Sequence, residues 1–156
     1  PTMGIDRINW DGHQYEVYPF MATTRRNYLT DVDADGAFCI RNSERSESDY
    51  TCEYVCVNFM LKTSYEGDLY VGGHWATDKD AETYKMQYDG EKGLYYTRLL
   101  LKQGYYSYNY TTPNGSVPDS EGSFYQTQNR YQGMVYYKGP MDRTWRLVAY
   151  RAIDFR

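Results

Sequence analysis

Residues 91–110, with the sequence EKGLYYTRLLLKQGYYSYNY, constrain the fold of this chain more than any other stretch. Residues 94–101 are rich in aromatic and aliphatic side chains but show no helical stripe. Three tyrosines then alternate along the chain, namely Tyr106, Tyr108 and Tyr110. A period of two with aromatic residues is typical of a β-strand. We therefore predict a central β-hairpin that turns at residues 102–104, with the alternating tyrosines in the core.

An isolated hairpin is only marginally stable in water, so the rest of the chain must supply further strands. The other segments predicted as strands are 7–10, 14–18, 37–41, 50–62, 68–71, 83–88, 131–138 and 145–151. Asp11-Gly12, between the first two, is a strong hairpin signal. Within 50–62 the more apolar face is predicted to point into the core, and it comprises Val55, Val57, Phe59 and Leu61. Short strands at regular spacing, without an amphipathic helix of ten residues, predict an all-β sandwich.

The charge balance argues against nucleic acid as a partner. The chain has 17 Lys and Arg against 21 Asp and Glu, and its pI is near 5.2. Binding to nucleic acid depends on Lys and Arg contacts with phosphates, and this chain has no basic tail. No apolar run approaches the roughly 20 residues of a membrane-spanning helix. We therefore expect neither a nucleic-acid partner nor a membrane span.

The charged loop at residues 42–49 suggests a division of the chain. We expect residues 1–48 to form N-terminal β-hairpins and a connector, and residues 49–156 to form the β-sandwich domain. The first segment belongs either to the same sandwich or to the end of a preceding domain. Because the sequence begins with Pro1 and has no initiator Met, we expect a piece of a longer chain.

Three cysteines, Cys39, Cys52 and Cys56, are an odd set. Cys52 and Cys56 lie four residues apart on a predicted strand, which separates them by roughly 13 Å, too far for a disulfide. The sequence leaves open whether Cys39 pairs with either. The interpretation we favour is that all three are small buried hydrophobic residues.

Asp31, Asp33, Asp35 and Gly36 resemble the start of a calcium-binding loop, in which alternate oxygen ligands precede a sharp turn. The twelfth position of such a loop, which requires a bidentate Glu, is Asn42. The three aspartates therefore remain a weak metal candidate, and an acidic hairpin turn is the better interpretation.

Nothing in the sequence indicates nucleophilic catalysis. There is no Gly-x-Ser-x-Gly motif, and neither His13 nor His74 adjoins a Cys or Ser. We expect no catalytic residue, no cofactor and no enzymatic activity.

The aromatic surplus is the remaining signal, since 20 residues are Tyr and 3 are Trp. Exposed Tyr and Trp can stack on sugar rings or form a protein interface. Trp75 follows two glycines and precedes a polar loop. Tyr136 and Tyr137 are adjacent on a predicted strand, so one of them must face outward. With Tyr125 in a predicted edge segment, these residues are the candidate partner or ligand surface.

Residues 68–75 (DLYVGGHW), followed by the strands of residues 94–110, are similar to glycogen-binding modules of the early-set immunoglobulin-like type. That resemblance implies an immunoglobulin-like sandwich with an N-terminal β extension. It also implies a carbohydrate-binding module that uses surface aromatics near Trp75. The second sugar-stacking Trp of those modules has no match in residues 111–121.

A second resemblance covers most of the chain. Its motifs are LLKQGYYSY (100–108), EGSFYQTQN (121–129), MVYY (134–137) and the segments 28–42, 49–61 and 142–150. In this order they resemble the C-terminal domain of a Bacteroidetes family that includes the plug subunit of the type 9 secretion translocon. The resemblance implies a periplasmic or outer-membrane-associated, non-enzymatic interaction domain. Its implied partner is an outer-membrane secretion channel, which it closes from the periplasmic side.

Overall fold

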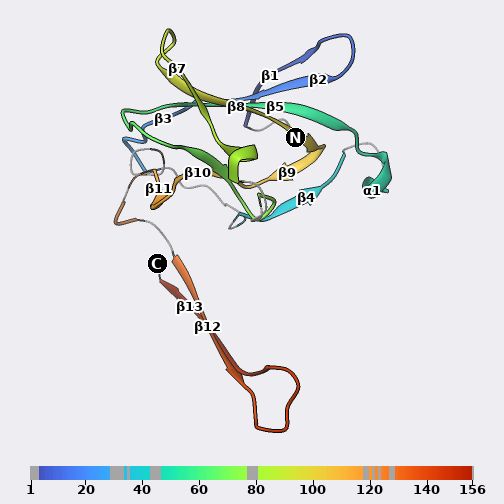
Figure 1. Cartoon of the computed structure of the whole chain (residues 1–156), viewed down its shortest axis with the longest axis vertical. Coiled ribbons are helices and arrows are strands. Elements are labelled where there is room, and N and C mark those ends of the chain that lie inside the picture. The colour runs from blue at the N-terminus through green and yellow to red at the C-terminus, as the bar shows by residue number, and fades with distance from the viewer. Residues whose placement is uncertain are drawn as a thin grey trace. The chain divides into compact units, whose positions relative to one another are not determined.

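The computed structural model describes residues 4–28, 34, 36–42, 47–76, 81–117, 120, 122, 124–126 and 129–155. The chain folds as two compact units, Pro1–Gly122 and Ser123–Arg156, which are described in turn. We call them the sandwich unit and the hairpin unit. Figure 1 shows that strands dominate both of them.

The first layer of the sandwich unit is a six-stranded sheet. Along the sheet the strands are β1 (Ile5–Trp10), β2 (Tyr15–Pro19), β5 (Tyr54–Lys62), β8 (Leu94–Lys102) and β7 (Gln87–Asp89), with β3 (Ala22–Thr23) also paired to β5. Its centre is the antiparallel pair of β5 and β8, which are nine residues each and stay in register from Tyr54↔Lys102 to Leu61↔Tyr95. Along β8 burial alternates, with Tyr95, Thr97 and Leu99 buried and Tyr96, Arg98 and Leu100 exposed, so one face of this strand is covered while the other meets solvent.

The second layer consists of much shorter strands. One sheet contains β6 (Tyr70–Gly72), β10 (Asn109–Thr112) and β11 (Gly115–Ser116), and a separate pair contains β4 (Phe38–Ile40) and β9 (Gly104–Tyr106). Two short helical turns, α1 (Ser48–Thr51) and η1 (Ala81–Tyr84), complete the unit. Part of η1 falls where the sequence predicted a strand over 83–88, and only β7 of that strand forms.

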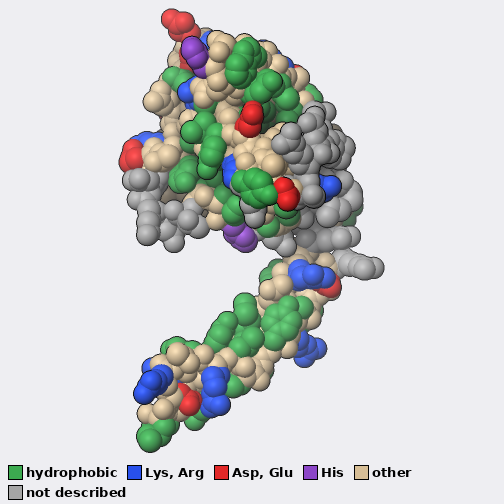
Figure 2. Space-filling view, turned by 90° about the vertical axis from the view of Figure 1, so that its right-hand side faces the viewer, with side chains coloured by type: hydrophobic (Ala, Val, Ile, Leu, Met, Phe, Trp, Pro, Cys, Tyr) green, Lys and Arg blue, Asp and Glu red, His purple; other side chains and the backbone are tan. Residues whose placement is uncertain are grey.

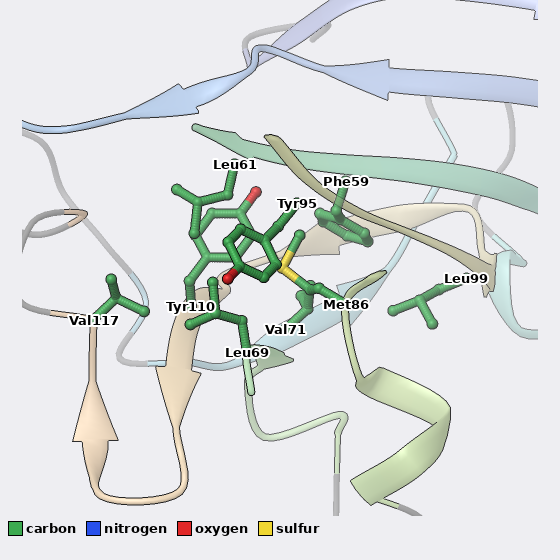
Figure 3. Packing of buried hydrophobic residues seen from close by; sticks show 9 residues of the cluster. All are labelled: Phe59, Leu61, Leu69, Val71, Met86, Tyr95, Leu99, Tyr110 and Val117. Atoms are coloured by element: carbon green, nitrogen blue, oxygen red, sulfur yellow. The ribbon is translucent and has the colours of Figure 1, made fainter. Parts of the chain in front are cut away.

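The core lies between the two layers and draws side chains from both (Figure 3). Its buried members are Phe59, Leu61, Leu69, Val71, Met86, Tyr95, Leu99, Tyr110 and Val117. Phe59 and Leu61 belong to the face of β5 that the sequence predicted to point inward, and they are only 2% and 0% exposed. The predicted all-β sandwich is confirmed.

The predicted central hairpin over residues 91–110 is wrong. β8 pairs with β5 and β7, β9 pairs with β4, and β10 pairs with β6 and β11. The turn at residues 102–104 therefore carries the chain from one sheet to another instead of folding it back on itself. Gly104 permits this crossing, because a Cβ at that position would overlap the Cys39 carbonyl oxygen on β4. A glycine in a strand is often a mark of such a close backbone approach.

The alternation of the three tyrosines is only partly maintained. Tyr110 is 4% exposed, and its hydroxyl donates a hydrogen bond to the Met60 carbonyl at 3.3 Å. Tyr108 is half-buried and packs edge-on against Phe59, with ring centroids 4.8 Å apart. Tyr106 lies on β9, in a different sheet from Tyr110 on β10. Only Tyr110 is therefore a fully buried core residue.

The division of the chain differs from the predicted boundary at residue 49. β1 and β2 form the expected hairpin across Asp11-Gly12, and β2 then runs parallel to β5. The Glu16 carboxylate extends this connection, since it accepts hydrogen bonds from Asn58 on β5 and Arg98 on β8. The N-terminal strands thus belong to the six-stranded sheet, and the observed boundary between units follows Gly122.

The hairpin unit consists of two long antiparallel strands, β12 (Asn129–Tyr137) and β13 (Arg146–Phe155). They confirm the last two predicted strands and extend the second one by several residues. Every residue of both strands is exposed.

Two further sequence expectations concern cysteines and membrane spans. All three cysteines are free thiols. Cys52 and Cys56 are buried, as expected, whereas Cys39 on β4 is exposed, so the expectation of burial is wrong for Cys39. Among the described residues, no helix is long and apolar enough to cross a membrane.

Candidate functional site

The candidate residues fall into two separate places in the fold. Trp75 belongs to the sandwich unit, whereas Tyr125, Tyr136 and Tyr137 belong to the hairpin unit. The weak metal candidates Asp31, Asp33 and Asp35 lie outside the described residues. Within the part of the chain that is described, no group of three or more His, Cys, Asp or Glu side chains could hold a metal ion.

Trp75 follows β6 in a tight loop that is anchored by two other segments. The His74 amide donates to the Gly36 carbonyl at 2.8 Å, and the Trp75 Nε1–H donates to the Ser107 carbonyl at 3.2 Å. Gly73 makes this close approach feasible, because a Cβ there would lie 2.8 Å from the Ser107 oxygen and would overlap the indole. Gly73 therefore helps to set the position of Trp75.

The Trp75 ring is packed among other aromatic rings. It stacks on Phe59, with ring centroids 6.4 Å apart and an interplanar angle of 17°. Tyr84 and Tyr106 meet it edge-on, at 5.9 and 5.7 Å. Phe38 stacks in turn on Tyr106 at 5.8 Å. These rings connect the core to a short row of aromatic side chains that leads outward to the exposed Phe38.

This row forms one side of a hollow of about 400 Å³. The hollow is lined by Phe38, Trp75, Thr83, Tyr84, Leu99, Leu100, Leu101, Lys102 and Tyr106. We call it the aromatic hollow. It lies beside the end of β8, between this strand and the β4–β9 pair, which contributes Phe38 and Tyr106. Its volume is within the range of small-ligand sites, and it is also large enough to accept an apolar side chain of a partner protein.

The polar groups of two rings of the hollow, Trp75 and Tyr106, are already hydrogen-bonded within the chain. The Trp75 indole N–H donates to the Ser107 carbonyl, and the Tyr106 hydroxyl donates to the Lys102 carbonyl. Burial raises the pKa of Tyr106, so this hydroxyl is neutral at physiological pH. The aromatic hollow therefore offers mainly neutral, apolar surface.

The second candidate surface is the hairpin unit, whose hydrophobic side chains are exposed together with its Lys and Arg side chains (Figure 2). Tyr136 pairs with Leu147 and Tyr137 pairs with Arg146, so the two tyrosines lie on opposite faces. Each is 52% exposed, and Tyr125 is 95% exposed. The sequence predicted that one of the adjacent tyrosines faces outward, and both of them are exposed.

The loop of the hairpin is ordered by one carboxylate. Asp142 Oδ2 accepts hydrogen bonds from the Gly139 amide at 2.9 Å and from the Arg146 guanidinium at 3.1 Å. This arrangement leaves the side chains of Met141 and Trp145 at the surface, 95% and 66% exposed. The tip of the hairpin therefore presents two large apolar side chains at the surface of a turn that Asp142 holds in shape.

Most of the residues that line the hollow could not be predicted to lie together from the sequence. Tyr84 lies on η1, in a segment predicted as a strand, and Phe38 comes from β4, far away in the chain. Tyr106 was predicted to be core and instead lines the hollow. The glycine pair before Trp75 was the one local signal, because it marks a place where backbone and ring approach closely.

Comparison with solved structures shows that the fold occurs in another protein. No protein-family model matches the chain, and no curated protein matches it significantly. A crystal structure of a hypothetical protein from Parabacteroides merdae ATCC 43184 is similar, with a TM-score of 0.81 and 32% sequence identity. The match covers 98% of this chain, which spans 41% of that protein's length. The likeness supports the β-sandwich fold.

Proposed function

We propose that this chain is a non-enzymatic interaction domain that binds a protein partner through the aromatic hollow. The observation that carries the proposal is an open, apolar depression of about 400 Å³ with Phe38 and Leu100 exposed beside it. Apolar pockets bordered by exposed aromatic and aliphatic residues are the usual receptors for anchor side chains of a partner. The lining of the hollow is mainly aromatic and aliphatic, with Thr83 and Lys102 beside it, which suits the burial of an apolar side chain.

The setting of Trp75 favours a protein partner over a sugar. A sugar-binding platform needs an aromatic face open to the ligand and polar side chains that bond its hydroxyls. The Trp75 ring stacks on Phe59 and meets Tyr84 and Tyr106 at its sides, and its N–H is already bonded. An apolar side chain needs neither of these features, since it gains from burial alone.

The partner we propose is an outer-membrane secretion channel, reached from the periplasmic side. This part of the proposal comes from the resemblance to the plug subunit of the type 9 secretion translocon. It concerns the longer protein to which such a domain belongs. The aromatic hollow is the surface that we assign to the contact.

The test is co-purification of the affinity-tagged protein from detergent-solubilised membranes of its own organism. The key variant is Phe38→Glu, which places a charge beside the hollow at a side chain that is 47% exposed. The matched control is Phe20→Glu, because Phe20 is 61% exposed and does not line the hollow. We expect the wild type and the control to retain the channel, and Phe38→Glu to lose at least about 90% of it. Absence of the channel from the wild-type sample would refute the partner, and equal recovery with both variants would refute the surface.

A second candidate is carbohydrate binding, and the specific observation in its favour is that Trp75 does line the aromatic hollow. Affinity electrophoresis through gels containing glycogen or starch tests it directly. Retardation of the wild type that disappears in Trp75→Phe would support a stacking role for the indole. Unchanged migration of both proteins in every polysaccharide would remove this candidate.

A further inference from the structure

Strand β8 is paired on both sides over only part of its length. On one side, β5 pairs with residues 95–102. On the other side, β7 pairs only with residues 94–96. The chain before β7 turns away to the second layer, where the Met86 amide donates to the Leu69 carbonyl at 2.7 Å. The second half of β8 therefore has an edge that no strand in the described part of the chain covers.

The register of the sheet determines which main-chain groups face this open edge. The Gln103 amide donates to the Glu53 carbonyl, on the β5 side, at 2.8 Å. The N–H and C=O groups of successive strand residues point to alternate sides. Those of Leu101 therefore point to β5, and those of Arg98 and Leu100 point to the open edge. Within the described residues, no hydrogen bond reaches these groups of Arg98 or Leu100, so they are available to a further strand.

The aromatic hollow lies along the same edge. It touches four consecutive residues of β8, 99–102. Neighbouring side chains of a strand point to opposite faces, so a hollow that touches all four borders the edge of the strand and not one of its faces. The Tyr106 ring lines the hollow, and its hydroxyl donates to the Lys102 carbonyl, which also points away from β5. The open main-chain edge and the apolar hollow are therefore adjacent.

An open edge beside a pocket is the arrangement that binds an extended peptide by strand addition. In that mode, main-chain hydrogen bonds hold the added strand, and pockets select alternate side chains along it. A strand beside β8 would direct every second side chain to the core side of the sheet, where the buried Leu99 lines the hollow. A hollow of about 400 Å³ has room for a large apolar side chain at that position.

Charge indicates which strand fits the edge. Among the described residues, Lys102 is the one charged residue that lines the hollow, so an acidic residue in the added strand would be attracted to it. The hairpin unit of this chain, or of a second copy, does not meet that requirement. Its two acidic side chains, Asp142 and Asp154, are already in ion pairs with its own arginines. The edge therefore favours a segment of another protein that carries an apolar and an acidic residue.

We propose that the partner binds by strand addition at the open edge of β8. An extended segment of the partner bonds to the main-chain groups of Arg98 and Leu100 and inserts an apolar side chain into the aromatic hollow. An acidic residue of the same segment lies beside Lys102. This inference rests on the proposed function, since it names the form and the chemistry of the segment that the hollow receives.

The first experiment tests whether the edge is open in the chain alone. Amide hydrogen exchange is followed by NMR on the ¹⁵N-labelled full chain. After correction for intrinsic rates, we expect the amides of Leu99 and Leu101, which face β5, to exchange at least about 100-fold more slowly than that of Leu100. Equally slow exchange at Leu100 would show that a segment of this chain, or of a second copy, already holds the edge, and would overturn the proposal.

The second experiment removes one main-chain donor. Leu100→Pro deletes the outward N–H but keeps the pairing to β5, because proline is tolerated where the N–H of a strand residue faces away from its neighbour. Leu100→Ala is the matched control, since it shortens the same side chain and keeps the N–H. In the co-purification described above, we expect Leu100→Pro to recover at least about 10-fold less of the channel than Leu100→Ala. Circular dichroism checks that both variants are folded.

The outcomes separate this inference from the proposed function. Absence of the channel from the wild-type sample would refute both. Equal recovery with Leu100→Pro and Leu100→Ala would refute strand addition alone and leave the hollow as the binding surface. If the proline variant does not fold, amide exchange in the wild-type complex with the channel, read by mass spectrometry, decides. We expect the Arg98 and Leu100 amides to slow at least about 10-fold on binding, and unchanged rates would overturn the proposal.

The third experiment tests the acidic residue of the partner segment. Lys102→Glu reverses the charge beside the hollow, and we expect it to lower recovery of the channel at least about fivefold. Lys62→Glu is the control, because Lys62 is exposed on β5 and does not line the hollow. Equal recovery with the two variants would contradict the charge that we assign to the partner segment.

Discussion

The sandwich unit and the hairpin unit are built from the same kind of sequence, yet only one of them buries it. In β8 the residues Tyr95, Thr97 and Leu99 are at most 9% exposed, and they alternate with exposed neighbours. In β12, which is equally long and richer in tyrosine, every residue is exposed. The difference arises because β8 has a facing layer and β12 has none within its own unit. Alternation in sequence therefore identifies a strand but does not decide which of its faces is covered.

The largest difference in stability is expected between alanine substitutions of two leucines. Leu61→Ala removes a side chain that is 0% exposed in the sandwich core, whereas Leu147→Ala removes one that is 52% exposed in the hairpin. We expect Leu61→Ala to lower the free energy of unfolding by about 3 kcal/mol, because it leaves a cavity. Leu147→Ala should lower it by less than about 1 kcal/mol, because its side chain is already half-exposed. Urea denaturation followed by circular dichroism measures both.

An equal loss for the two leucines would contradict the comparison, since it would mean that the hairpin is packed within the monomer. A variant that unfolds completely would be replaced by Leu61→Val, for which the expected loss is smaller and in the same direction.

The next largest difference in stability is expected between alanine substitutions of two glycines that lie in strands. A Cβ on Gly104 of β9 would overlap the Cys39 backbone, whereas one on Gly133 of β12 would meet only the Arg151 carbonyl oxygen, at an ordinary 3.9 Å. We expect Gly104→Ala to cost about 2 kcal/mol, because backbone atoms must shift. Gly133→Ala should be neutral or slightly stabilising, because it restricts the unfolded chain. For a chain of this size, thermal unfolding should show a midpoint lower by about 2–4 °C per kcal/mol for the first change only. Equal midpoints would show that β4 and β9 are not closely paired.

Individual segments show how much of the fold could be predicted from the sequence. The Asp11-Gly12 turn and the inward face of β5 are local signals, and both were predicted correctly. The turn at residues 102–104 was not, because a glycine before a strand is compatible with either a hairpin or a change of sheet. Which of the two structures forms depends on the strand with which β9 pairs. That strand is β4, which lies more than sixty residues earlier in the chain. Such long-range pairing leaves no trace in a local pattern.

The candidate site shows the same limit. Trp75 was identified because Gly72 and Gly73 precede it, and the structure does place it on the aromatic hollow. Its packing against Phe59 was not foreseeable, since the two residues come from facing layers. Phe38 and Tyr84 reach the hollow only through the tertiary fold. Local sequence can therefore suggest a single anchor residue, but the shape around it depends on contacts between distant segments.

The smallest difference in stability is expected between variants that break two different ion pairs. Glu16 bonds to both Asn58 and Arg98 across three strands of the sandwich, and its side chain is only 13% exposed. Asp154 pairs with Arg130 on the hairpin, where the two side chains are 54% and 61% exposed. We expect Glu16→Gln to lower the free energy of unfolding by about 1 kcal/mol at pH 7. Asp154→Asn should lower it by at most about 0.5 kcal/mol, because solvent screens an exposed pair.

The way in which the free energy of unfolding depends on pH distinguishes the Glu16 pair from the Asp154 pair more clearly than the size of the loss at pH 7 does. The hydrogen bond from Arg98 holds the pKa of Glu16 below its ordinary value of 4.5. A group that titrates at lower pH in the folded chain contributes its full stability above its unfolded pKa and loses it as the pH falls through its folded pKa. The difference in stability between wild type and Glu16→Gln should therefore be constant from pH 7 to about 5 and shrink at lower pH. A difference that persists unchanged to pH 3 would mean that Glu16 stabilises the N-terminal strands by packing, and that its charge contributes little.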